Sequence, residues 1–129
     1  MRSLGFVEVS GVVAAVDALD IMCKTASVNL VTWERKLGGR LVTLVVEGSV
    51  SDVTEAIEAA KANCISRVRA ANVIANPHDE TVRLVELSRS RLQKKNAQKA
   101  EAQEAKPAEQ PAKPATAKKT TTRKPKTNG

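Results

Sequence analysis

Few side chains in this chain of 129 residues have the chemistry of a catalytic or metal-binding site. Cys23 and Cys64 are too few for a disulfide scaffold and do not have the spacing of metal ligands, so we interpret them as small buried apolar residues. His78 is the only histidine, and without a paired nucleophile we interpret it as a surface residue in the first turn of a helix. No acid–base pair or phosphate-binding loop is evident either. The sequence therefore predicts no catalytic residue, no metal site and no cofactor.

The segment in which we expect the function to lie is a short loop, called the glycine loop below (residues 35–40). Gly38 and Gly39 are adjacent at its centre, and Arg35, Lys36 and Arg40 surround them. A Gly-Gly pair between two strands is typical of a hairpin turn, because glycine adopts positive φ angles at little cost. The sequence thus predicts a hairpin with cationic side chains near its tip.

The glycine loop lies between two copies of a strand–helix unit, at residues 4–20 and 41–60. The apolar patterns predict strands at residues 4–9, 28–34, 41–47 and 70–74, with a helix after the first strand and another after the third. Asn76 as N-cap and Pro77 as first helical residue predict a third helix, which Asp79 and Glu80 favour electrostatically. This order predicts an α+β fold of the ferredoxin-like type, with a four-stranded antiparallel sheet, helices on one face and an extra C-terminal helix.

The first helix is apolar on nearly all sides, with Ser10 as its expected N-cap. Its expected buried stripe follows the spacing of one helix face: Val12, Val16, Leu19, Cys23 and Ala26. Five further residues widen that face: Ala14, Ala15, Ala18, Ile21 and Met22. A helix of this kind is buried on more than one side, so we expect its second side to contact another subunit. The second helix has an ordinary stripe, at Val53, Ile57, Ala60 and Cys64, with Ser49 or Ser51 as its N-cap.

The net charge of the chain lies entirely in its C-terminal part. Residues 1–92 contain 11 Lys/Arg and 11 Asp/Glu, whereas residues 93–129 contain 10 Lys/Arg and 3 Glu and so carry the whole +7. Residues 93–129 also contain no Leu, Ile, Val, Met or aromatic residue, so burial is insufficient to offset their ordering entropy. We therefore expect a folded domain at residues 1–92 and a disordered basic tail, rich in Lys, Ala, Pro and Thr, at residues 93–129.

Neither a membrane span nor a secretory signal is evident in the sequence. No apolar run approaches the roughly 18 residues that a membrane helix requires. The N-terminus lacks a basic stretch followed by an apolar segment and a small-residue cleavage site. We therefore expect a cytoplasmic protein without a membrane partner.

Five segments resemble the single-domain, hexamer-forming shell proteins of bacterial microcompartments, the BMC-domain family. They are LGFVEV at residues 4–9, the helix at residues 11–20, MCKTASV at residues 22–28, LVTLVVEG at residues 41–48 and VIANPH at residues 73–78. These segments occur in the family's order and at its spacing over roughly two-thirds of the chain. The resemblance implies a structural protein without catalytic activity, located in a microcompartment shell in the bacterial cytoplasm.

For the site residues, the resemblance implies a pore on the axis of the hexamer that passes small polar metabolites. The residues that line this pore are Lys36, Leu37, Gly38, Gly39 and Arg40. Glycine lets six backbones approach one axis, and the nearby cations favour anionic metabolites. The loop is one residue longer than the family's usual loop and ends in Arg40 instead of a small residue. Whether Arg40 narrows the pore or folds away from it stays open.

The resemblance also implies contacts at the edges of the hexamer, formed by Lys24, Asn76, Pro77 and His78. The family has an arginine before Pro-His where this chain has Asn76, so we expect weaker tiling between hexamers. The expected partners are other copies or other shell proteins in mixed hexamers, neighbouring hexamers, and a cargo or acidic partner bound by the tail.

Two other function classes remain as alternatives. The basic tail is also typical of a nucleic-acid-binding oligomer, which would bind phosphates through its lysines. Phe6 and Trp33 are the only aromatic residues, too few for an RNA-binding sheet that stacks bases. An enzyme or a small-ligand regulator built on a ferredoxin-like trimer is the second alternative, and no motif in the sequence favours it.

Overall fold

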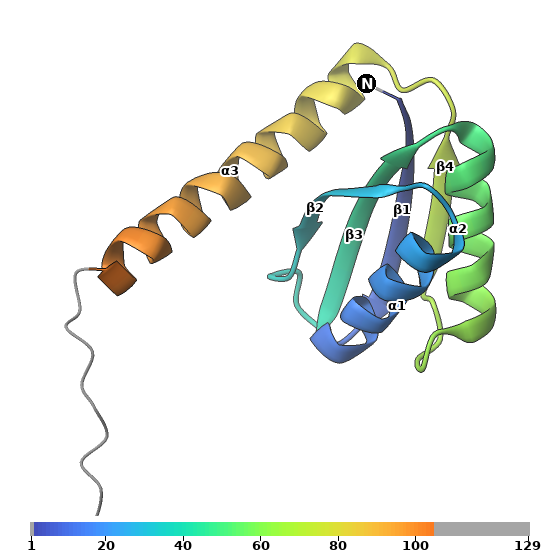
Figure 1. The fold of residues 1–129 in the computed structure, drawn as a ribbon, viewed down its shortest axis with the longest axis horizontal. Coiled ribbons are helices and arrows are strands. Elements are labelled where there is room, and N and C mark those ends of the chain that lie inside the picture. The colour runs from blue at the N-terminus through green and yellow to red at the C-terminus, as the bar shows by residue number, and fades with distance from the viewer. Residues whose placement is uncertain (1, 105–129) are drawn as a thin grey trace, which may run out of the picture.

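The computed structural model describes residues 2–104, and its seven elements follow the predicted order (Figure 1). They are β1 (Ser3–Ser10), α1 (Val12–Thr25), β2 (Asn29–Glu34), β3 (Leu41–Gly48), α2 (Val50–Asn63), β4 (Ala70–Ile74) and α3 (Asp79–Glu104). The part of the predicted disordered tail at residues 105–129 lies outside the described residues.

The four strands form one antiparallel sheet in the order β2-β3-β1-β4, which confirms the predicted fold (Figure 1). β1 and β3 are the central strands and pair along their whole length, from Ser3 opposite Gly48 to Ser10 opposite Leu41. Both are rich in valine, and β-branched side chains pack well on a pleated, buried surface. β2 and β4 are the two edge strands, so the glycine loop leaves the sheet at one of its edges.

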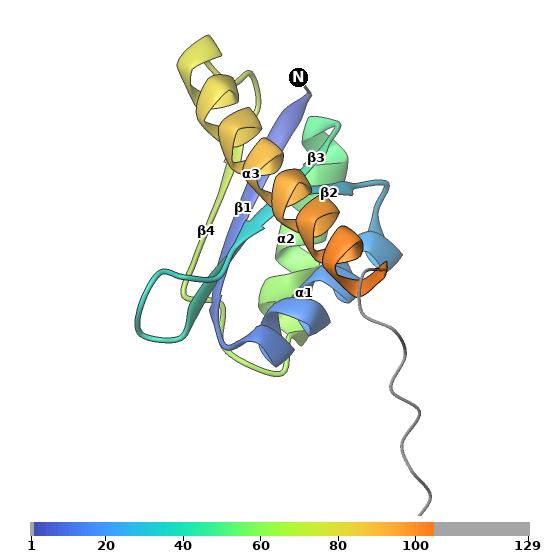
Figure 2. The same ribbon diagram turned by 90° about the vertical axis from the view of Figure 1, so that its left-hand side faces the viewer.

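The alternation of side chains along the central strands creates two apolar layers. Val7 of β1 and Leu44 of β3 belong to the layer under α1 and α2, whereas Leu4 and Val45 belong to the opposite layer. Val85 of α3 packs into that second layer, so α3 crosses the face of the sheet that α1 and α2 leave free (Figure 2). The two helices of the repeated units therefore lie on one face, as predicted, and the extra helix lies on the other.

The caps of α1 and α2 differ from each other. Ser49 caps α2, because its hydroxyl oxygen accepts a hydrogen bond of 3.1 Å from the backbone N–H of Asp52. The prediction that Ser10 caps α1 was wrong: Gly11 occupies the N-cap position at φ 96°, and no side chain caps the helix. Ser10 is instead the last residue of β1, where it pairs with Leu41.

The start of α3 also differs from the prediction. The helix begins at Asp79 and not at Pro77 as predicted, so Asn76 is not its N-cap. His78 takes that role: its Nδ1 atom accepts a hydrogen bond of 3.1 Å from the N–H of Glu80, and its carbonyl oxygen accepts one of 3.0 Å from Val82. Pro77 accordingly lies before the helix. The acidic residues predicted for the first turn, Asp79 and Glu80, are there.

The buried stripe predicted for α1 was wrong in its rotation about the helix axis. Its buried residues are Ala14, Ala15, Ala18 and Met22. Val12, Val16 and Cys23 of the predicted stripe are exposed. Because α1 packs against both α2 and the sheet, the small alanine side chains allow a close approach that valine would prevent. The stripe predicted for α2 is confirmed, with Val53, Ile57 and Ala60 buried and Cys64 partly buried against the same core.

The helix α3 is longer than the sequence pattern predicts. We expected order to end near residue 92, but α3 continues to Glu104, so the prediction of disorder was wrong for residues 93–104. These residues are all exposed and consist mainly of Ala, Lys, Gln and Glu, which are strong helix formers. Intrinsic helix propensity, and not burial, accounts for this extension. None of the helices in the part of the chain that the structure describes is long and apolar enough to cross a membrane.

Candidate functional site

The glycine loop forms an exposed hairpin between β2 and β3, as predicted. Gly38, Gly39 and Arg40 have consecutive positive φ angles of 75°, 58° and 62°, and the N–H of Leu41 donates to the carbonyl oxygen of Gly38 over 3.1 Å. No atom lies within 4 Å of the position that a Cβ atom on Gly38 would take. Glycine is therefore favoured at the tip for its backbone conformation and not for space.

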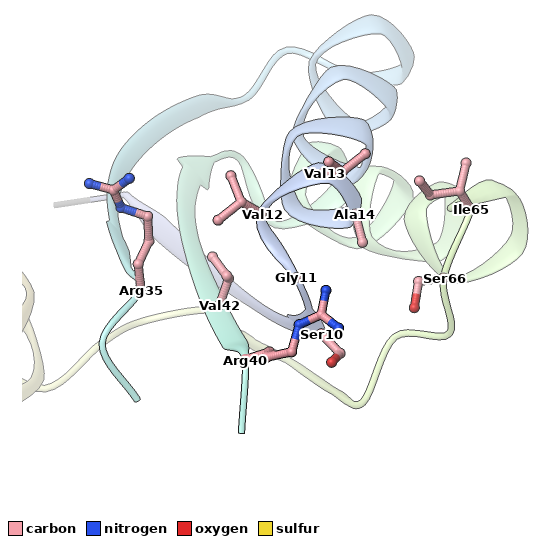
Figure 3. Close-up of a pocket in the computed structure, with 10 residues that line it drawn as sticks. All are labelled: Ser10, Gly11, Val12, Val13, Ala14, Arg35, Arg40, Val42, Ile65 and Ser66. Carbon is pink, nitrogen blue, oxygen red and sulfur yellow. The ribbon is translucent and has the colours of Figure 1, made fainter. Parts of the chain in front are cut away.

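Arg40 folds back from the tip of the loop. Its carbonyl oxygen accepts a hydrogen bond of 2.7 Å from the N–H of Gly11, and a guanidinium nitrogen lies 3.8 Å from the Cβ position of Gly11. Figure 3 shows the Arg40 side chain beside Ser10 and Gly11, at the start of α1. Of the two orientations left open by the sequence, the single chain has the one that turns away from the tip. The bond to Gly11 helps to offset the roughly 1–2 kcal/mol that a positive φ costs a residue other than glycine.

A cavity of about 560 Å³ lies between the ends of the glycine loop and the start of α1 (Figure 3). Arg35 and Arg40, at either end of the loop, line it together with Val12 and Val13 of α1. Its remaining walls come from strand and loop segments: Ser10, Gly11, Ala14, Val42, Ile65 and Ser66. Cationic and apolar side chains thus share one hollow beside the loop.

One side of α1 and Ile65, which follows α2, together expose a group of large apolar side chains, called the α1 patch below. It consists of Val12, Val13, Val16 and Ile65, whose exposed fractions are 45%, 73%, 54% and 68%. The four residues line one shallow hollow, together with Asp17 and Asp20. The alanine side of α1 is covered by the chain itself, whereas this valine side is not. Clustered exposed apolar residues of this kind are typical of a surface that contacts another protein.

Lys24 lies in the last turn of α1, with its Nζ atom 2.8 Å from Oδ2 of Asp20. The hydrogen bond to Asp20 and, after it, the negative charge of Asp20 raise the pKa of Lys24. The side chain of Lys24 is 76% exposed, so this ion pair lies in solvent and contributes little to folding. The neighbouring Cys23 is exposed as well, and partial burial followed by the charge of Asp20 raises the pKa of its thiol.

The segment of Asn76, Pro77 and His78 connects β4 to α3. Pro77 is buried, whereas Asn76 and His78 are exposed. The hydroxyl of Ser3 donates to the carbonyl oxygen of Ala75 over 2.7 Å and so fastens the segment to β1. In residues 2–104, no hydrogen bond or ion pair joins this segment to Lys24. The structure places Lys24, Asn76 and His78 at the surface but buries Pro77, and it does not bring Lys24 together with the other three within one chain.

A groove under α3 was missed by the sequence analysis. It measures about 280 Å³, and its apolar walls are Phe6, Leu37, Val45, Leu84, Val85 and Leu87. The hydroxyl groups of Thr32 and Ser88 lie 3.0 Å apart on its floor, and Ser88 also donates to Glu34. The exposure of the groove depends on where α3 crosses the sheet, which the sequence pattern does not specify. Among residues 2–104, no three His, Cys, Asp or Glu side chains gather as metal ligands would.

Comparison with known proteins identifies relatives of this chain. The family model described as the BMC domain matches residues 3–77. The chain is 41% identical over 86 residues to the bacterial microcompartment shell protein PduA of Citrobacter freundii, covering 65% of this chain and 91% of that protein. It is 44% identical over 87 residues to the shell protein EutK of Escherichia coli K12, covering 66% of this chain and 52% of that protein.

Two further matches agree with these. The carboxysome shell protein CsoS1C of Hydrogenovibrio crunogenus is 39% identical over 92 residues, covering 68% of this chain and 88% of that protein. A crystal structure of a microcompartment protein from Desulfitobacterium hafniense DCB superposes with a TM-score of 0.55 at 26% identity. That match covers 62% of this chain and 44% of the solved chain, so this chain spans less than half of that protein. None of these relatives gives support to the alternative of a nucleic-acid-binding oligomer.

Proposed function

Because this chain belongs to the BMC domain family, which includes bacterial microcompartment shell proteins, we propose that it forms hexameric tiles of such a shell. Residues 36–40 line the central pore of each tile, which passes small polar metabolites. The protein has no catalytic role in this proposal. It acts inside the bacterial cell as a barrier, in contact with other copies or with other shell proteins.

The observation that carries this proposal is the position of the α1 patch directly beside the glycine loop. Val12 and Val13 of the patch line the same cavity as Arg35 and Arg40. A neighbouring copy that covers the patch therefore lies next to the loop. Repetition of that contact around a rotation axis brings the loops of all copies together at the axis. Burial of the exposed valines drives the association.

The pore chemistry follows from the exposed tip. Gly38 and Gly39 present backbone and no side chain there, which leaves an opening when six copies meet. Lys36 is exposed in the same loop, whereas Arg40 turns back toward Gly11, so we assign the pore cation to Lys36. A ring of lysines around a narrow opening favours small anions over cations of the same size. Lys24 and His78 are exposed and so available for contacts between hexamers, which Asn76 makes weaker than an arginine would.

Cysteine cross-linking tests this proposal at the loop itself. The variant Leu37→Cys, with the native Cys23 and Cys64 both replaced by Ser, places one thiol beside the tip of each copy and keeps both glycines. We expect a short thiol-specific cross-linker to give covalent dimers at low micromolar protein concentration, because the six tips meet at one axis. Ser51→Cys in the same background is the matched control, since Ser51 is exposed at the start of α2. Equal dimer yields from the two variants would overturn the proposed pore.

A further inference from the structure

A small basic cavity lies between the end of β2 and the middle of α3. It measures about 150 Å³, and two elements contribute its cations: Arg35 and Lys36 follow β2, whereas Arg91 and Lys95 come from α3. Its other lining residues are Trp33, Glu34, Ser88 and Leu92. Arg91 and Lys95 are four positions apart and so lie on the same side of the helix. The cavity is thus a place where four cations from two parts of the fold converge.

These four cations are not neutralised by the rest of the described chain. Within residues 2–104, the ion pairs formed by Lys or Arg involve Lys24, Lys61, Arg83 and Arg89, and none involves a cation of this cavity. Glu34 is the one acidic residue of the lining, and its carboxylate accepts a hydrogen bond from Ser88. On α3 itself, residues 87–100 contain five Lys or Arg and no Asp or Glu. The cavity therefore has an excess of positive charge.

One of the four cations is also held in position. The guanidinium carbon of Arg35 lies 4.6 Å from the centre of the Trp33 ring, within the range of a cation–π interaction. Leu92 adds an apolar wall on the helix side. A planar guanidinium fixed in this way can donate two parallel hydrogen bonds to an oxyanion. Lys36 belongs to this cavity and to the glycine loop, so the cavity adjoins the proposed pore residues.

We propose that this basic cavity binds a small oxyanion with two or more negative charges, such as a phosphorylated or pyrophosphate-bearing metabolite. Its volume of about 150 Å³ is below the roughly 300–1,000 Å³ of pockets for drug-sized ligands, which favours a compact ligand. Arg35 covers the Trp33 ring, so that ring is not free to stack on the bases of a nucleic acid. A role in collecting anions for the pore rests on the proposed function, whereas the binding itself does not.

The fluorescence of Trp33 provides a direct readout, since Trp33 is the only tryptophan and lines the cavity. We would titrate the full chain with sodium pyrophosphate at constant ionic strength and expect a saturable change in its emission. Arg91→Gln with Lys95→Gln should weaken pyrophosphate binding about tenfold or more, because each unit charge a few ångströms away contributes about a fivefold effect even in water. Lys94→Gln with Lys99→Gln is the matched control, which removes two charges from α3 outside the cavity and should change the affinity less than twofold.

Three results would overturn the proposal. They are an emission that does not saturate with pyrophosphate, an equal loss of affinity in both double variants, and tighter binding of single-stranded DNA than of pyrophosphate at the same ionic strength. Circular dichroism of each variant excludes unfolding as the cause. Six-fold rings together with absent pyrophosphate binding would refute this site and leave the proposed function intact. Saturable binding by a protein that forms no rings would refute the proposed function and leave this site intact.

Discussion

The substitution Val13→Asp separates the assembly of the protein from its folding. Val13 is 73% exposed in the single chain, and full burial of a valine side chain contributes about 1.5–3 kcal/mol. Covering Val13 in a neighbouring subunit therefore contributes about 1–2 kcal/mol at each contact, and a hexamer repeats that contact six times. Aspartate loses this contribution and adds the cost of bringing a carboxylate into an apolar contact. We expect the ring to dissociate.

The same substitution should leave the folded single chain intact. Val13 lies in the first turn of α1, which contains no acidic residue and no side-chain cap. An aspartate there interacts favourably with the positive end of the helix, by about 0.3–1 kcal/mol. The free energy of unfolding measured in urea at low protein concentration should thus be unchanged or slightly higher.

Size-exclusion chromatography with light scattering measures the mass in solution. We expect a hexamer for the unmodified chain and a smaller species for Val13→Asp. The matched control is Leu84→Asp, which introduces the same charge at a similarly exposed apolar residue, 68% exposed, on α3. The α1 patch would be refuted as the contact surface by a Val13→Asp protein that keeps the hexamer mass, or by a Leu84→Asp protein that loses it equally.

Three further predictions concern stability and reactivity. Gly5→Ala should destabilise the fold by about 1–3 kcal/mol in urea unfolding, because the new Cβ would lie 2.6 Å from Cγ1 of Val53 in a packed core; unchanged stability would contradict this packing. Ser49→Ala should cost about 1 kcal/mol by the same assay, because it removes the N-cap of α2, whereas Ser51→Ala should cost less than half of that. Burial and, after it, the charge of Asp20 raise the pKa of the Cys23 thiol above its ordinary value, so its alkylation by iodoacetamide should accelerate at a higher pH than that of an unperturbed thiol. Asp20→Asn should shift the acceleration to lower pH, and a shift to higher pH would contradict the assigned cause.

The sequence was sufficient to predict the strands, because their signals are local. The apolar runs and the Gly-Gly pair placed the ends of β1, β2 and β3 to within one residue, and β4 at Ala70–Ile74 has the predicted bounds. The rotation of α1 was not predictable in the same way. A helix that is apolar on nearly all sides has no periodicity that distinguishes the core side from the exposed side. The close packing of α1 on α2 selects Ala14 and Ala18 for the core, and that contact is tertiary.

The candidate site was predictable only where its signal is local in the sequence. Gly38 and Gly39 indicated the exposed hairpin, which the structure confirms. The backbone carbonyl of Arg40 accepts a hydrogen bond from Gly11, a residue distant in sequence, and no local pattern predicts that contact. The basic cavity likewise requires α3 to cross beside the end of β2. No sequence pattern relates Arg91 and Lys95 to Arg35, and only the structure places them in the lining of one cavity.

Electron cryo-microscopy of the purified full chain tests the central claim most directly. The account predicts six-fold rings with a central hole bounded by residues 36–40, in which each copy covers the α1 patch of its neighbour. Single particles of one chain at high protein concentration, or rings in which the valine side of α1 faces solvent, would contradict it.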